Sequence, residues 1–262
     1  MAVEPKKISE LNEVTAADDS DNLVIVTGMG STPVTKRIRA DNLIPVPEAP
    51  DLTINWINAG ETWTYASATT FTVEGNQIDK YVKGTRIRLT QTTIKYFVVV
   101  GASYGANTTV TVTGGTDYSL ASAAIVGPQL SYGTPPDWPG WFNYTPTPSA
   151  SGSMTFTSTS VIFAVFSVIG NTAIVQGKIT GTTGGTASTA IKATLPIDSA
   201  LLTANTNFKA NVYANVSDGT FLSGFGELEA GTPDVVAVRR YDGANWGLGA
   251  SRSIGYTAIY QI

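Results

Sequence analysis

The sequence predicts an all-β protein made of several small antiparallel domains. Charged residues make up only 14% of the chain, against roughly 25% in an average soluble domain, and threonine, serine, glycine and asparagine are abundant. Apolar and polar residues alternate over many short segments, which is the period of a strand with one buried face. Glycine-rich and Asp-Gly turns separate these segments, so strands and turns are favoured over helices.

Residues 1–44 form a first unit that is rich in charge. An acidic run at residues 18–21 ends a short helical pattern, and residues 23–28 and 34–38 predict two strands around a glycine turn. An isolated two-stranded hairpin is marginally stable in water, so we expect this unit to dock on another copy or another protein.

The order of KISEL, DDSDNLVIV, a glycine turn and TKRIRADNL resembles the short N-terminal segment of structural appendage proteins of tailed bacteriophages. The resemblance implies a virion anchor on the outside of the particle, which would bind other virion structural proteins. An ordinary hairpin at the start of a soluble domain is the alternative. The apolar positions expected to serve as the anchor are Ile8, Leu11, Leu23, Ile25 and Ile38.

A proline-rich linker at residues 45–51 precedes a small β module at residues 52–126. We expect a barrel or compact sandwich of four or five strands. Alternation places Arg86 and Arg88 on the solvated face of one strand, while the unbroken apolar run near residues 95–100 predicts a central strand covered on both sides. The expected strands are residues 63–73, 81–90, 94–100 and 108–113.

Residues 127–148 form a connector that holds six of the 13 prolines and two of the five tryptophans. That composition predicts a stiff, extended segment, with Trp138 and Trp141 packed against the second module or a neighbouring subunit. The block from TWTYASATTFTVEG to PDWPGWFNYTPT also resembles a module of tailed-phage virion and prophage proteins. The resemblance implies a structural role.

Residues 149–262 predict a jelly-roll-like β-sandwich, because eight short strand patterns are joined by turns such as Asp-Gly and Gly-Gly. The terminal YTAIYQI predicts a last strand held within the sheet. The series VIG, GKITGTTGGT and ATLP resembles the C-terminal β-sandwich tips of phage tail and head fibres, which implies a homotrimer and possible contact with host-surface glycans. The expected strands are residues 154–157, 161–169, 172–180, 189–195, 208–216, 220–229, 235–241 and 253–262.

Charge and composition make several partners poor candidates. The net charge is −4 and no basic run is present, so neither nucleic acid nor an anionic membrane is an expected partner. The longest apolar run, residues 161–169, is about half the ~20 residues of a membrane span, so a buried strand is expected there. With no cysteine and no histidine, thiolate and histidine chemistry is excluded, and we expect no cofactor and no metal site.

No catalytic residue is predicted. A glycosidase-type carboxylate pair remains the one catalytic alternative, although carboxylates in Asp-Gly turns usually accept hydrogen bonds from their own backbone. The acidic residues available for such a pair are Asp218, Glu227, Glu229, Asp234 and Asp242.

The best candidate for ligand contact is the turn at residues 239–247. Its aromatic and polar side chains could face a sugar ring, and a tryptophan there could equally fill the core. The candidate ligand-binding residues are Tyr241, Asp242, Asn245 and Trp246. The leading hypothesis is thus an adhesive virion fibre protein, with a purely structural head or neck fibre or decoration protein and a polysaccharide depolymerase as alternatives.

Overall fold

The computed structural model describes residues 22–27, 34–39, 55–200, 211–217, 221–229 and 234–262. Every regular element among them is a strand, so the all-β prediction is confirmed. The chain divides into two compact units, Met1–Asp51 and Leu52–Ile262. No helix able to cross a membrane occurs in the described ranges.

The first unit contains one antiparallel hairpin, as predicted. Strand β1 (Asn22–Thr27) pairs with β2 (Val34–Arg39), and the register sets Leu23 opposite Ile38 and Ile25 opposite Lys36. Ile8 and Leu11, the other two expected anchor positions, lie outside the described residues.

The second unit begins with a seven-stranded antiparallel sheet in the order β3-β9-β6-β7-β8-β5-β4. Its edge strands β3 and β4 are joined by residues 59–62 alone, a link that reaches less than about 19 Å. A flat sheet would hold these edges roughly 29 Å apart, so the sheet must curl into a small barrel. The strands are β3 (Ile57–Asn58), β4 (Trp63–Ser67), β5 (Thr70–Glu74), β6 (Arg86–Gln91), β7 (Thr93–Tyr104), β8 (Asn107–Thr113) and β9 (Val126–Ser131).

The expected four or five strands are thus too few for this module. Residues 63–73 fold back on themselves as the β4–β5 hairpin. Both β3 and β9 are further strands that the alternation did not indicate, and β9 comes from the start of the connector. A two-residue strand carries too little pattern to be recognised, and Pro128 within β9 masks its signal.

Strand β7 is covered on both sides, as predicted. Phe97 and Val99 lie in the barrel core, where Trp63 stacks on Phe71 with ring centroids 4.2 Å apart. Val98 points the opposite way and belongs to the core of the C-terminal domain. The barrel and the C-terminal domain therefore share buried surface.

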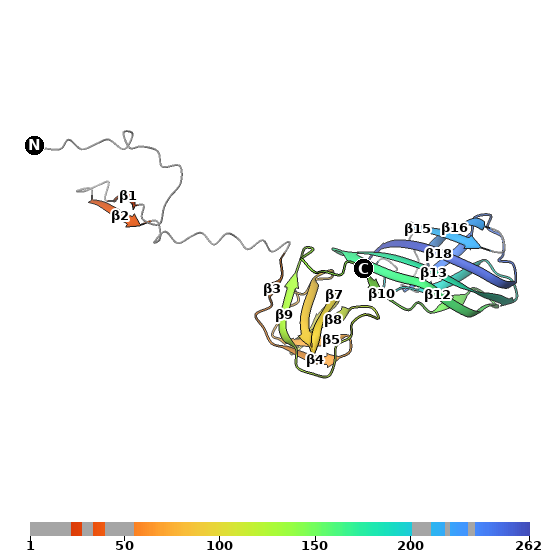
Figure 1. Cartoon of the computed structure of the whole chain (residues 1–262), viewed down its shortest axis with the longest axis horizontal. Coiled ribbons are helices and arrows are strands. Elements are labelled where there is room, and N and C mark those ends of the chain that lie inside the picture. Colours follow the sequence, from red (N-terminus) through yellow and green to blue (C-terminus); the bar gives the residue numbers. More distant parts are fainter. Residues whose placement is uncertain (1–21, 28–33, 40–54, 201–210, 218–220, 230–233) are drawn as a thin grey trace, which may run out of the picture. The chain divides into compact units, whose positions relative to one another are not determined.

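The C-terminal domain is built from one antiparallel sheet of nine strands in the order β10-β12-β13-β18-β15-β16-β17-β14-β11 (Figure 1). The series β18-β15-β16-β17 is a Greek key, in which the fourth strand returns to lie beside the first, as in jelly-roll domains. The strands are β10 (Phe142–Asn143), β11 (Pro148–Ala150), β12 (Met154–Ile169), β13 (Thr172–Gly185), β14 (Ala190–Thr194), β15 (Asn211–Ser217), β16 (Phe221–Leu228), β17 (Val235–Arg240) and β18 (Gly249–Gln261).

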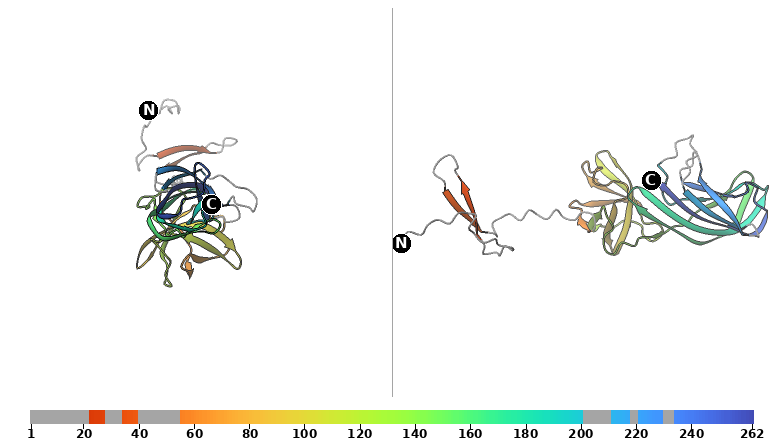
Figure 2. Two further views of the ribbon diagram at one scale, coloured as in Figure 1. Left: turned by 90° about the vertical axis from the view of Figure 1, so that its right-hand side faces the viewer. Right: turned by 90° about the horizontal axis from the view of Figure 1, so that it is seen from above.

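At one end of this strand order β10 lies beside β12, and β11 at the other end also contacts β12. The sheet therefore closes around one core (Figure 2). The last strand, β18, pairs with β13 on one side and β15 on the other, which confirms that the C-terminal segment is held in the sheet. The largest side chains of this core that have no exposed surface are Phe142, Phe166 and Trp246.

Strand β12 departs from the prediction at its centre. Two expected strands merge into one of 16 residues, with register shifts around residues 157–163. Val161, Ile162 and Phe163 are exposed, although a buried strand was expected there. The reason is that β10 pairs with β12 only at Val165 and Phe166, so residues 161–163 have a strand neighbour on one side only among the described residues.

Candidate functional site

The candidate turn lies at the end of the C-terminal domain that is remote from the barrel. Strand β12 reaches the barrel near its C-terminal end, where Arg86 Nη2 donates to the carbonyl oxygen of Val168 at 3.4 Å. Strand β18 begins at the opposite end of the sheet, where Gly249 pairs with Thr183. The loop of residues 241–248 leads into that end, which is called the distal end here (Figure 1).

Tyr241 and Asn245 are open to solvent in this loop. The Tyr241 side chain is 79% exposed, which leaves its ring face available for contact. Asn245 is also exposed and can both donate and accept hydrogen bonds. The two residues keep their candidate ligand-binding role as a prediction.

Asp242 accepts hydrogen bonds from two residues of its own turn. Its Oδ2 accepts from Arg240 Nη2 at 2.7 Å, and its Oδ1 accepts from the backbone N–H of Ala244 at 3.0 Å. The hydrogen bond from Arg240, followed by the one from Ala244, lowers the pKa of Asp242 to about 2. Asp242 therefore stays ionised and shapes the turn, as expected for an Asp-Gly carboxylate.

Trp246 does not join the exposed group, which corrects the sequence-based assignment. Its side chain is 0% exposed and belongs to the core, while its backbone N–H donates to the Ser188 carbonyl oxygen at 2.9 Å. Its Nε1 has no hydrogen-bond partner among the described residues. The large apolar area of an indole favours burial, so this residue anchors the loop and offers no ligand platform.

Three of the four described candidates for a carboxylate pair are held in ion pairs. Glu227 Oε1 accepts from Arg239 Nε at 2.7 Å, Glu229 pairs with Lys192, and Asp242 pairs with Arg240. Each of these three carboxylates is thus held in an ion pair within the domain. Asp218 lies outside the described residues. The described part of the chain contains no group of three or more acidic residues that could hold a metal ion.

A second organised region is the junction between the barrel and the C-terminal domain. Arg86 is only 5% exposed, which corrects its expected place on a solvated face. Its guanidinium lies 5.5 Å from the ring centre of Trp138 and donates to the carbonyl oxygens of Gly133 and Val168. Burial lowers the pKa of Arg86 from its usual value. The docked C-terminal domain covers what would be the wet face of an isolated barrel.

The two connector tryptophans behave differently. Trp138 packs against Phe142 with ring centroids 5.3 Å apart, and it also contacts Trp56 and Tyr96. Trp141 is 44% exposed, so of the two rings expected to pack against the second module or a neighbouring subunit, only Trp138 packs against the module. Contact of Trp141 with a neighbouring subunit stays a prediction.

Backbone contacts also fix this junction. Thr116 N–H donates to the carbonyl oxygen of Asn143 at 2.8 Å, and Asp117 accepts from both the backbone and the side chain of Asn143. A Cβ on Gly84 would overlap the carbonyl oxygen of Gly170. The junction therefore combines aromatic packing with a close approach of two backbones.

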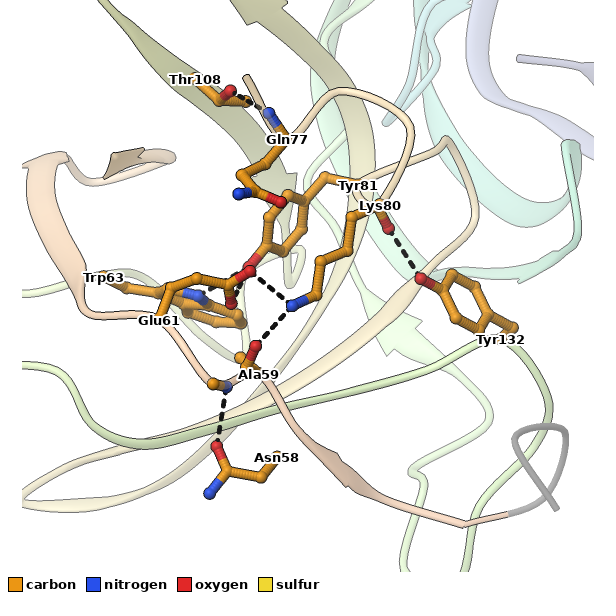
Figure 3. A network of polar contacts seen from close by, with 10 residues as sticks. Asn58, Ala59, Glu61, Trp63, Gln77, Lys80, Tyr81, Thr108 and Tyr132 are labelled. Carbon is orange, nitrogen blue, oxygen red and sulfur yellow. Dashed lines mark hydrogen bonds and ion pairs between the residues drawn. The ribbon is translucent and has the colours of Figure 1, made fainter. Parts of the chain in front are cut away.

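A partly exposed polar network on the barrel is the third organised region (Figure 3). Lys80 Nζ lies 2.5 Å from Glu61 Oε1, and Trp63 Nε1 donates to the Tyr81 hydroxyl at 2.8 Å. Tyr132 donates to the Lys80 carbonyl oxygen at 3.1 Å. Burial raises the pKa of Tyr81.

The Tyr81 hydroxyl therefore keeps its proton and is itself no ready base or nucleophile. The network ties the segment before β6 to the β3–β4 link and so helps to close the barrel. Its members are far apart in sequence and belong to no motif, so sequence reasoning had no signal for them.

No family model matches this chain, and neither the curated proteins nor the solved structures contain a match.

Proposed function

We propose that this protein is an adhesive structural component of a tailed-bacteriophage particle. Its N-terminal unit would attach it to other virion proteins on the particle exterior. Its C-terminal domain would present the distal loop to a glycan on the host surface. The observation that carries the proposal is the exposed distal pair, Tyr241 and Asn245, held at the far end of a two-domain β body.

The junction supports a role in presentation. Shared burial of Val98 and the contacts of Arg86 and Trp138 join barrel and C-terminal domain into one compact unit. Two domains that pack together hold the distal loops in a fixed position relative to the barrel better than two domains joined by a flexible linker do. The absence of a convincing acid pair in the described residues favours binding over polysaccharide cleavage.

The distal loop supports weak, repeated contact. An exposed tyrosine supplies an aromatic face, and asparagine supplies adaptable hydrogen bonds. One such contact would bind weakly, but several copies on a particle add up through effective concentration. A substitution that weakens the single site should therefore reduce binding of the isolated protein more than binding of the particle.

Assembly as a homotrimer is part of the proposal. Near the barrel, the outer face of β12, β13 and β18 carries Ile169 and Ile259, which are 61% and 43% exposed. Ile259 lies opposite Ile174 in the register, and Ile169 lies opposite Thr172, two positions from Ile174 along β13. Such a patch suits contact with further copies. Light scattering should give three times the chain mass, and a monomeric full chain would count against this part.

Two experiments test the function. Imaging of a particle that carries the protein should place the chain on its exterior, and absence from the virion would reject the proposal. The purified full chain should compete with the particle for adsorption to host cells. Tyr241→Ala should weaken that competition several-fold, whereas Tyr104→Ala, which removes a 52% exposed tyrosine from the barrel, should leave it unchanged.

A further inference from the structure

A polar groove crosses the outer face of the C-terminal domain and begins just after the loop of residues 241–248, at Ala250 and Ser251. It has a volume of about 550 Å³ and runs over β12, β13 and β18. Hydroxyl side chains and one lysine dominate its lining: Ser158, Lys178, Thr180, Thr182, Ser251 and Ser253.

The strand register explains why these groups converge. Lys178, Thr180 and Thr182 alternate along β13 and therefore share its outer face. Ser253 of β18 lies directly opposite Thr180, and Ser160 of β12 lies opposite it on the other side. The groove is thus built on three paired strands, which hold polar groups more firmly than a loop does.

Backbone irregularities mark both sides of the groove. Ser158 has φ 49° and Ser251 has φ 61°, and these are two of the four non-glycine residues with positive φ in the described part of the chain. Both sit at register shifts, one between Thr157 and Ser160 and one opposite the step from Gly181 to Thr183. Strained residues and bulges are concentrated at functional sites, where they re-aim side chains.

Lys178 is the charged group of this site. It is exposed and has no hydrogen-bond or ion-pair partner among the described residues. By contrast, Lys80 and Lys192 are each paired with a glutamate. Phe163 lies opposite Lys178 in the register and is 46% exposed. The groove therefore combines an available cation, several hydroxyl groups and an aromatic ring at its edge.

We propose that this groove binds an acidic saccharide. The carboxylate of the sugar would pair with Lys178, its hydroxyls would exchange hydrogen bonds with the serines and threonines, and a ring face would pack on Phe163. A single lysine without arginine or a helix N-terminus fits one carboxylate better than a phosphate group. This inference rests on the proposed adhesive function and names a second contact site with its ligand class.

The test uses the full chain and two purified probes of equal length, trigalacturonic acid and the neutral maltotriose. Titration followed by calorimetry or NMR should show tighter binding of the acidic trimer. Lys178→Gln should weaken that binding roughly tenfold, as expected for loss of one charge-assisted hydrogen bond. Lys83→Gln makes the same charge change at an exposed position of the barrel and should have no effect.

A second variant tests the site without changing charge. Thr180→Trp should fill the groove and reduce binding of the acidic trimer, with folding checked by circular dichroism. No detectable binding of trigalacturonic acid, equal binding of both probes, or equal losses in Lys178→Gln and Lys83→Gln would each overturn the proposal.

The competition assay on host cells distinguishes failure of the groove proposal from failure of the proposed adhesive function. If the wild-type chain competes for host cells and Lys178→Gln competes equally well without altered binding of the trimer, the groove assignment fails and the adhesive function stands. If the wild-type chain is absent from the virion and does not compete, the adhesive function fails, whatever the groove binds.

Discussion

At the scale of single residues, Gly84 allows the barrel and the C-terminal domain to meet backbone to backbone. Its φ is +85°, and a side chain there would collide with the carbonyl oxygen of Gly170. A glycine is needed for both reasons, because L-residues rarely adopt this conformation and the space is taken.

Gly84→Ala should therefore lower the free energy of unfolding by more than about 2 kcal/mol, from backbone strain and overpacking together. Gly75→Ala is the matched control, because Gly75 has φ +73° but no atom within 4 Å of its Cβ position. It should cost about 1–2 kcal/mol from strain alone. Urea unfolding of both variants measures the difference, and equal losses would show that the close approach contributes nothing.

A buried pair of tyrosines makes stability depend on alkaline pH. The hydroxyls of Tyr144 and Tyr256 lie 2.7 Å apart in the core. Burial raises the pKa of Tyr256 to about 12, and it raises that of Tyr144 as well. In the unfolded chain tyrosine ionises near pH 10, so ionisation above that pH favours unfolding.

The contribution of this pair should be complete below pH 10 and decline as pH rises toward 12, by about 3 kcal/mol for Tyr256 alone. The double variant Tyr144→Phe and Tyr256→Phe removes both hydroxyls together, so no single one is left unpaired. Its unfolding free energy, measured from pH 8 to 12, should fall less steeply than that of the wild type. Tyr241→Phe, at an exposed position, should follow the wild-type curve, and an unchanged slope in the double variant would contradict this account.

At the scale of elements, the connector is a shared part of both domains. Its beginning forms β9 of the barrel sheet, and β10 and β11 belong to the C-terminal sheet. Trp138 packs against Phe142 of β10 and against two barrel rings, Trp56 and Tyr96. Stiffness at this point therefore comes from packing as well as from proline.

Trp138→Ala should lower the free energy of unfolding by about 2–4 kcal/mol and widen the range of domain orientations, because a large contact surface is lost. Trp141→Ala, only three positions away but 44% exposed, should change stability by less than about 0.5 kcal/mol. Urea unfolding and small-angle X-ray scattering can compare the two variants. A larger effect of Trp141→Ala would indicate that the exposed ring is covered by another subunit.

At the scale of the whole molecule, the region Leu52–Ile262 should unfold as one cooperative unit. Phe166 of β12 stacks on Phe142 of β10, and Val98 of the barrel lies in the same cluster. Elements that share a buried core lose stability together.

Phe166→Ala should therefore reduce hydrogen-exchange protection in β6 and β7 of the barrel as strongly as in β13 and β18, by about 3–5 kcal/mol in opening free energy. Tyr104→Ala, which changes an exposed barrel residue, should leave both groups of strands protected. Barrel amides that keep their wild-type protection in the Phe166 variant would show that the two domains unfold independently.

Local pattern predicted much of the fold. The strands of the first hairpin, the doubly covered β7 and the terminal β18 all follow from runs of alternating or continuous apolar residues. For the candidate site, the sequence located the turn and indicated the backbone hydrogen bond of Asp242. It did not distinguish Tyr241 from Trp246, because both are aromatic residues near one turn and only packing separates them.

The sequence by itself determined that the protein is all-β, where most strands and turns fall, and which chemistry is excluded by the lack of cysteine and histidine. Only the tertiary structure decided that Arg86 is buried and Trp141 exposed, and that Lys178 stands unpaired in a hydroxyl-lined groove. The physical reason is that strand periodicity is a local property of the chain. Which face meets a second domain, and which polar groups converge there, depends on pairings between residues far apart in sequence.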